Sequence, residues 1–86
     1  MIGNRKGPGA GVVLLQIQDE EVYVLGLASR DGYFDLPKGG QEEGESEMEC
    51  AMRECWEETW ITDAVFFEDI RPLTLSQLTL FVGTTS

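Results

Sequence analysis

The sequence predicts an α+β fold in which one helix packs on one face of a mixed β-sheet. Three features lead to this expectation. Two apolar runs lie close together near the start of the chain, a capped amphipathic helix occupies its middle, and two further apolar runs follow. With 86 residues, the chain has room for one domain, and a domain of this size buries only about 60–65% of its unfolded surface.

The first two strands form a predicted hairpin. Residues 10–17 (AGVVLLQI) are a continuous apolar run, which is typical of a buried strand. A polar turn at 18–21 leads into residues 22–28 (VYVLGLA), which are rich in β-branched and aromatic side chains. A second turn, with Asp31-Gly32 at its tip, and a short strand at 34–36 are expected to follow.

The helix has a clear beginning in the sequence. Ser46 and Glu49 form an S-x-x-E capping box, which predicts a helix that starts there and runs to 58 or 59. An apolar stripe at i, i+3, i+4 and i+7 is expected to pack on the sheet. It consists of Met48, Ala51, Met52 and Cys55. Strands are expected after the helix at 61–70 and 73–83.

The negative charge of the chain is concentrated in one stretch. The formal net charge is −10, and residues 37–61 contain eight glutamates against only Lys38 and Arg53. So much negative charge in one place predicts a bound cation. It also argues against direct contact with a phosphate backbone as the main source of affinity. Polyanionic substrates are still compatible with the sequence if metal ions lie between the two sets of charges.

Three of these glutamates, Glu54, Glu57 and Glu58, share one sector of the predicted helix. Neighbouring like charges on a helix cost a few tenths of a kcal/mol per pair, and the last turn disfavours anions through the helix dipole. A divalent metal would compensate this charge. Arg53 could pair with Glu57 along the helix, or with a glutamate of the preceding loop. The alternative interpretation is an acidic helix face that simply contacts water.

The order of these residues resembles the Nudix box. Gly39 is followed by five residues and Glu45, and seven residues later comes the run 53–61, RECWEETWI. One position departs from the motif, because Trp60 stands where the family has glycine. Tryptophan at positive φ would be strained by about 1 kcal/mol or more. We therefore expect the turn to be rebuilt with Trp60 at an ordinary φ.

The resemblance implies a Nudix-like domain over residues 1–86, part of an α/β/α sandwich that is expected to be incomplete at its C-terminus. The implied activity is Mg²⁺-dependent hydrolysis of a pyrophosphate bond in a nucleoside diphosphate linked to another moiety, such as a nucleotide or dinucleoside polyphosphate. Mn²⁺ could replace Mg²⁺. The implied metal ligands are Glu54, Glu57, Glu58 and the Gly39 carbonyl. Arg53 completes the catalytic set, and Glu54 would be either a third ligand or the general base.

The resemblance also implies roles for residues outside the helix. Lys38 and Arg30 are expected to bind substrate phosphate, while Glu45 and Gly40 support the loop. The Pro-Lys-Gly sequence at 37–39 is similar to family members that act on dinucleoside polyphosphates or on 5′-phosphorylated RNA. Two alternatives stay open: a catalytically impaired module that binds metal and nucleotide, and an interaction domain with no metal site.

The two cysteines, Cys50 and Cys55, are spaced i, i+5, which suits neither a disulfide nor a shared zinc site. Both are expected to be reduced thiols, with Cys55 in the core and Cys50 partly exposed. No apolar run is long enough for a signal peptide or a membrane span, so the expected location is cytoplasmic. An uncovered apolar sheet face would favour a homodimer.

Overall fold

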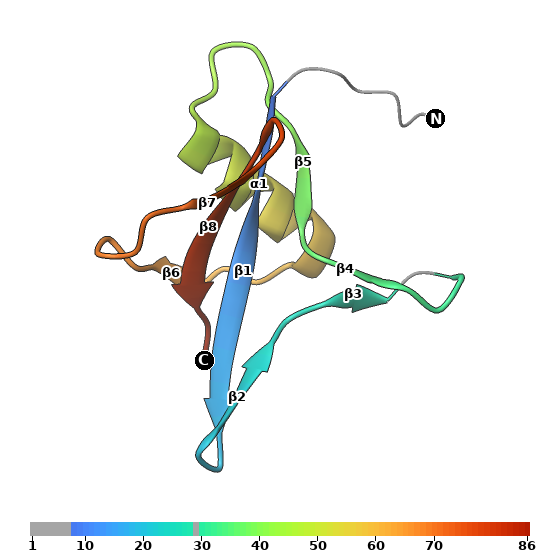
Figure 1. The fold of residues 1–86 in the computed structure, drawn as a ribbon, viewed down its shortest axis with the longest axis vertical. Helices are drawn as coiled ribbons and strands as arrows, with labels where there is room; N and C mark the ends of the chain where they lie inside the picture. Colours follow the sequence, from blue (N-terminus) through green and yellow to red (C-terminus); the bar gives the residue numbers. More distant parts are fainter. Residues whose placement is uncertain (1–7, 29) are drawn as a thin grey trace.

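The computed structural model describes residues 8–28 and 30–86 (Figure 1). One helix and eight strands make up this part of the chain. They are β1 (Gly9–Gln18), β2 (Glu21–Val24), β3 (Leu27–Ala28), β4 (Phe34–Asp35), β5 (Lys38–Gly40), α1 (Glu47–Thr59), β6 (Val65–Phe66), β7 (Leu73–Leu75) and β8 (Leu78–Thr84). The predicted α+β class is confirmed.

Strand β1 is the centre of a six-stranded mixed sheet. It pairs with β8 in parallel, from Gly9 opposite Leu78 to Leu15 opposite Thr84. On its other edge it pairs with β5 and then with β2, both antiparallel. Strands β6 and β7 pair antiparallel with β8. Strands β3 and β4 form a separate two-stranded sheet that projects away from the rest of the fold (Figure 1).

Helix α1 covers one face of the sheet, as predicted. The buried core joins alternate residues of β1 to the inner side of the helix. Its members are Ala10, Val12, Leu14, Cys50, Ala51 and Cys55. Burial of such a cluster supplies much of the stability of a small domain, at roughly 25 cal/mol per Å² of apolar surface.

The buried side of the helix differs from the predicted stripe in two places. Cys50 is fully buried rather than partly exposed, while Met52 is 52% exposed. The reason is that α1 contacts β5 as well as β1, so the helix side that faces Gly39 is covered. Cys50 lies there, and its thiol donates to the Gly39 carbonyl at 3.6 Å. Both cysteines are free, as expected.

Two predicted strands are shorter or divided in the structure. The run 22–28 is split between β2 and β3, and of 61–70 only Val65 and Phe66 form a strand. The residues before β6 are used differently, because Ile61 and Ala64 pack against the buried core. The run 73–83 folds back on itself as the β7–β8 hairpin. Strand β5, within the glycine loop, was not predicted.

The sheet face opposite α1 is apolar and carries no helix among the described residues. Leu15 pairs with Val24 and Ile17 with Val22, and these alternate positions of β1 point away from the helix. Ile17 is 70% exposed. In the described part of the chain, no helix is long and apolar enough to cross a membrane.

Candidate metal and phosphate site

The site is built on the register of helix α1, which its N-terminal cap fixes. The Ser46 hydroxyl accepts a hydrogen bond from the Glu49 amide at 3.0 Å, and the Glu49 carboxylate accepts one from the Ser46 amide at 2.8 Å. This is the predicted capping box. Because the first turn is fixed in this way, the glutamates of the last two turns are placed beside the loop that precedes the helix.

Arg53 connects the helix to that loop. Its Nε donates to Glu45 Oε2 at 2.6 Å, and Nη2 donates to the Gly40 carbonyl at 3.0 Å. Its Nη1 donates to Glu54 Oε2 at 3.0 Å and to Glu57 Oε1 at 3.3 Å. Both alternatives from the sequence therefore occur together, with Arg53 bound to the helix and to the loop. A planar guanidinium can hold these carboxylates in fixed orientations, which a lysine could not do.

Glu45 is positioned to support the loop. One of its oxygens accepts from Arg53 Nε, and the other accepts from the Glu42 amide at 2.9 Å and from Arg53 Nη2 at 3.1 Å. The hydrogen bond from Arg53 is the main reason that the pKa of Glu45 is lowered to about 2. The carboxylate therefore stays charged at neutral pH and holds Arg53 in place.

Glu54 and Glu58 meet beside the backbone of β5. The Glu54 carboxylate, in a side chain that is 13% exposed, lies so close to Gly39 that a Cβ on that residue would overlap it. Glu58 Oε1 accepts a hydrogen bond from the Lys38 amide at 3.2 Å. Burial raises the pKa of Glu58, and the neighbouring Glu54 carboxylate adds to this shift. Two carboxylates are thus brought together, of which Glu54 also accepts from Arg53.

Glu57 and the Gly39 carbonyl, also predicted ligands, are bound to other groups. The Glu57 side chain is 48% exposed and bonds to Arg53. The Gly39 carbonyl accepts from the Cys50 thiol. Within residues 8–28 and 30–86, no three His, Cys, Asp or Glu residues are grouped as a metal site.

The Glu54–Glu58 pair nevertheless fits a hard divalent cation. Mg²⁺ is commonly held by one or two carboxylates, with waters and substrate phosphates as its other ligands, rather than by a complete protein cage. All the side-chain donors here are oxygens, as Mg²⁺ prefers. Burial, and to a lesser extent the Glu54 carboxylate, raise the pKa of Glu58, and a bound cation would stabilise its charged form.

The two predicted phosphate-binding residues lie in different places. Lys38 is next to the carboxylate pair through its backbone, while its ammonium forms an ion pair with Asp35 at 2.5 Å. This hydrogen bond lowers the pKa of Asp35. Sequence reasoning missed Asp35, although its spacing of three residues from Lys38 was a signal. Arg30 lies in the exposed turn between β3 and β4, outside the larger sheet, and contacts none of the site glutamates.

Trp60 ends the helix in a conformation that the sequence analysis did not expect. Its φ of 65° and ψ of 14° are left-handed, so the prediction of an ordinary φ was wrong. The Trp60 amide donates to the Trp56 carbonyl at 2.8 Å. Thr59 supports the turn, because its hydroxyl donates to the Cys55 carbonyl and accepts from the Ile61 amide. This geometry is the common left-handed helix cap, which glycine usually occupies.

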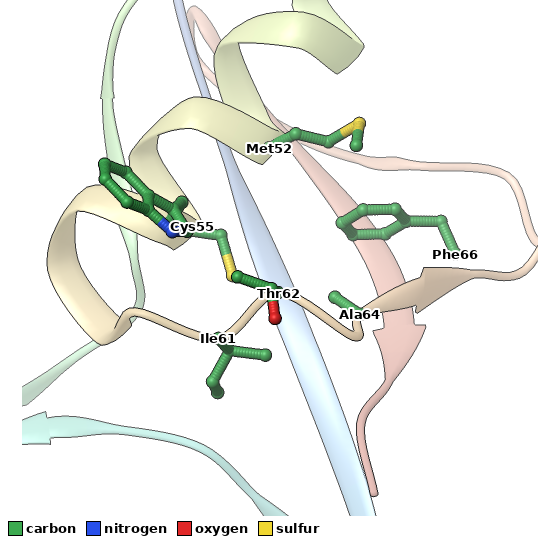
Figure 2. A pocket seen from close by; sticks show the side chains of 7 residues that line it. Met52, Cys55, Ile61, Thr62, Ala64 and Phe66 are labelled. Atoms are coloured by element: carbon green, nitrogen blue, oxygen red, sulfur yellow. The ribbon is translucent and has the colours of Figure 1, made fainter.

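An apolar cavity of about 200 Å³ lies between the C-terminal half of α1 and the segment that leads to β6. Met52 and Phe66 face each other across it (Figure 2). The lining contains no charged residue, so the cavity is separate in character from the carboxylate site. No pattern in the sequence had indicated it.

Comparison with known proteins agrees with the Nudix resemblance. The family profile described as NUDIX domain matches residues 5–81. Over 63 residues the chain is 35% identical to Nudix hydrolase 25 of Arabidopsis thaliana. That match covers 73% of this chain but 35% of the relative, so the chain spans about a third of the length of this protein.

Two solved structures of a C. elegans Ap4A hydrolase have a similar fold. One aligns with a TM-score of 0.79 at 24% identity and covers 92% of this chain and 67% of the other. A binary complex aligns with a TM-score of 0.76 at 22% identity, covering 93% and 66%. At these identities the likeness establishes the fold.

Proposed function

Since this chain belongs to the NUDIX family, we propose that it hydrolyses a pyrophosphate bond in a nucleotide derivative with the help of a divalent metal ion. The observation that carries this proposal is the convergence of Glu54 and Glu58 beside the β5 backbone. Within an acidic chain, such a pair suits a reaction in which a cation separates the carboxylates from an anionic substrate.

Mg²⁺ is the proposed ion, with Mn²⁺ as a substitute, and Glu54 and Glu58 are its proposed protein ligands. When bound, the ion would neutralise phosphate oxygens and lower the pKa of a coordinated water. Glu57 would join these ligands only by giving up its hydrogen bond to Arg53. The N–O distance of that bond is 3.3 Å, which is longer than those of the hydrogen bonds from Arg53 Nη1 to Glu54 and from Nε to Glu45.

The chain's own residues would orient the reacting groups. Arg53 holds Glu54 through Nη1, and Glu45 holds Arg53 in turn. The lack of a side chain at Gly39 leaves room for the Glu54 carboxylate. If Glu54 acts as the general base instead of a ligand, the same contacts would aim it at the attacking water.

A dinucleoside polyphosphate is the proposed substrate. Two structural neighbours are named Ap4A hydrolases, and Lys38 belongs to β5, where its backbone amide donates to Glu58 of the carboxylate pair. Its ion pair with Asp35 is at the surface, with a Lys38 side chain that is 36% exposed, and such pairs contribute little to stability. Lys38 could therefore exchange Asp35 for a substrate phosphate. A 5′-phosphorylated RNA end offers the same phosphate chemistry, and Arg30 would serve only a substrate that extends to the β3–β4 turn.

Product release from a substrate panel tests this proposal. Diadenosine tetraphosphate, ADP-ribose, nucleoside triphosphates and 5′-triphosphorylated RNA would each be incubated with the chain and Mg²⁺. We expect Glu54→Gln and Glu58→Gln to lower kcat by about 100-fold or more. Glu43→Gln, on an exposed loop residue, is the matched control and should be unaffected. Full turnover in Glu58→Gln would refute the assignment.

Binding without turnover is the second candidate. It is favoured by the engagement of Glu57 with Arg53 and by the departure from the motif at Trp60. In that case nucleotides would bind in the presence of Mg²⁺, and no substrate of the panel would yield product even though circular dichroism showed a folded chain.

A second copy of the chain is the proposed partner for the apolar face opposite α1. Lys38, which pairs with Gly11 and points the same way, is the charged strand residue described on this face. Most of the other strand positions are apolar, whereas eight carboxylates lie in residues 37–61. Association through it would bury apolar side chains and keep the acidic helices apart. Ile17→Glu should convert a dimer to a monomer in sedimentation, while Phe34→Glu, on the separate β3–β4 sheet, should not. A monomeric wild-type chain would contradict this.

A further inference from the structure

Trp60 combines backbone strain with an exposed indole. Its φ of 65° is one of four positive values at non-glycine residues in the described chain, and the other three are Asp19, Glu20 and Ser76. Those three are small or polar residues, whereas tryptophan is bulky, and the left-handed conformation is strained for an L-residue with a large side chain. Glycine would form the same cap without this strain.

The Trp60 side chain makes no contact within the described protein that would offset this strain. The residue is 80% exposed, more than any other large hydrophobic side chain described. The ring contact between Phe66 and Phe81 does not include Trp60. The Trp60 indole is therefore available to an external ligand. Strained residues often mark functional sites, and the inference runs from the observed outlier to the function.

The indole is attached close to the proposed phosphate site. Trp60 follows Glu58 by two residues, and Glu58 contacts the Lys38 amide at 3.2 Å. A nucleotide joins its base to its phosphates through a single ribose. A group that binds the base must therefore be close to the phosphate site, and the C-terminal end of α1 contains both Glu58 and Trp60.

We propose that Trp60 is a stacking platform for the base of the bound nucleotide, which rests on the function proposed above. A flat aromatic surface attracts every base through its π-face and does not read hydrogen-bonding edges. Recognition by an uncharged ring suits a chain with a net charge of −10. The substrate would then be a nucleotide whose base is unpaired and accessible. The protein would accept different bases and would bind the larger purines more tightly.

Fluorescence provides a direct test, because the chain has two tryptophans. Trp56→Phe leaves Trp60 as the reporter, and Trp60→Phe leaves Trp56 as the matched control. Each variant would be titrated with ATP and with inorganic tripolyphosphate, in the presence of Ca²⁺ to limit turnover. We expect ATP, but not tripolyphosphate, to quench Trp60 emission, and neither ligand to quench Trp56.

Affinity measured by calorimetry completes the test. Trp60→Gly should weaken ATP binding by about tenfold or more, the fold-change that corresponds to one base–aromatic stack, while tripolyphosphate binding is unchanged. Trp60→Phe should bind ATP with most of the wild-type affinity that Trp60→Gly loses. The melting temperature of Trp60→Gly should not fall, because glycine adopts positive φ without strain, so a merely structural role would not explain the result.

The outcomes separate the two proposals. Equal binding of ATP and tripolyphosphate to the wild-type chain would overturn the base platform and leave the hydrolase proposal standing. Quenching of Trp60 by ATP without hydrolysis of any substrate in the panel would refute the hydrolase proposal and support the platform. Unchanged ATP affinity in Trp60→Gly would also overturn the platform.

Discussion

The two ends of helix α1 are built in opposite ways. At the N-terminal end, Ser46 and Glu49 satisfy each other's backbone amides, and the acidic residues of the first turn complement the helix dipole. At the C-terminal end, Glu57 and Glu58 oppose the dipole, the last turn contains no basic residue, and Trp60 is in a left-handed conformation. The first end is stabilised by its own sequence, and the second leaves charge and strain that a ligand could relieve.

Two glutamates near these ends show the difference in their pKa values. Glu45, just before the helix, has a pKa lowered to about 2, chiefly by its hydrogen bond from Arg53. Glu58, in the last turn, has a raised pKa because it is partly buried and lies near Glu54. Glutamate thus stabilises the structure as a charged group at Glu45, whereas at Glu58 the charged form is disfavoured. The direction of the shift indicates which carboxylate would gain from a bound cation.

Removal of Arg53 should have the largest effect on stability, because this residue connects both ends. We expect Arg53→Ala to lower the free energy of unfolding by about 2 kcal/mol, since it leaves the partly buried Glu45 and Glu54 without their charged donor. Urea denaturation with EDTA present would measure it. Arg53→Lys keeps the charge but loses the planar fork, and wild-type stability in that variant would contradict the proposed geometry.

Acid titration should separate Glu45 from the other carboxylates. Its pKa is about 2 in the folded protein against an ordinary 4.5, so its stabilising contribution is complete above pH 4.5 and is lost as the pH falls towards 2. The difference in unfolding free energy between wild type and Glu45→Gln should therefore shrink over this interval. A difference that is constant with pH would show that Glu45 acts by shape and not by charge.

The helix cap should have a smaller effect that is confined to its own end. Ser46→Ala is expected to cost about 1 kcal/mol, the usual value for the loss of such a cap. The increase in melting temperature on addition of Mg²⁺ should be the same as in the wild type, because the Glu54–Glu58 pair is unchanged. A smaller Mg²⁺-dependent shift would show that the two ends are coupled.

The smallest expected effect is also the most specific, because it depends on the cation. In EDTA, Glu58→Gln should raise the free energy of unfolding by about 0.5 kcal/mol, since it removes a charge that both the helix dipole and Glu54 disfavour. In Mg²⁺, the wild type should gain stability by ligand binding and the variant should not. Calorimetry in both buffers, with Glu43→Gln as the control, would measure the difference. A loss of stability in EDTA would be the opposite of this expectation.

Prediction from sequence was more complete for the N-terminal end than for the C-terminal end. The capping box was confirmed residue by residue, because its partners are three positions apart and need no other part of the chain. Arg53 was given two possible partners, and the structure uses both. The conformation of Trp60 was predicted wrongly. Propensity favoured an ordinary φ, but the left-handed cap ends the helix and lets Ile61 pack against the core.

The amino-acid sequence by itself determined the α+β class, the start of the helix, the acidic segment and the family motif. All of these depend on local spacing or on periodicity along one element. The tertiary structure alone decided that Cys50 is buried, that Glu54 lies against Gly39 and that Glu58 reaches the Lys38 amide. These contacts join the helix to β5, and their geometry is set by how both pack against β1, which no spacing within either segment specifies.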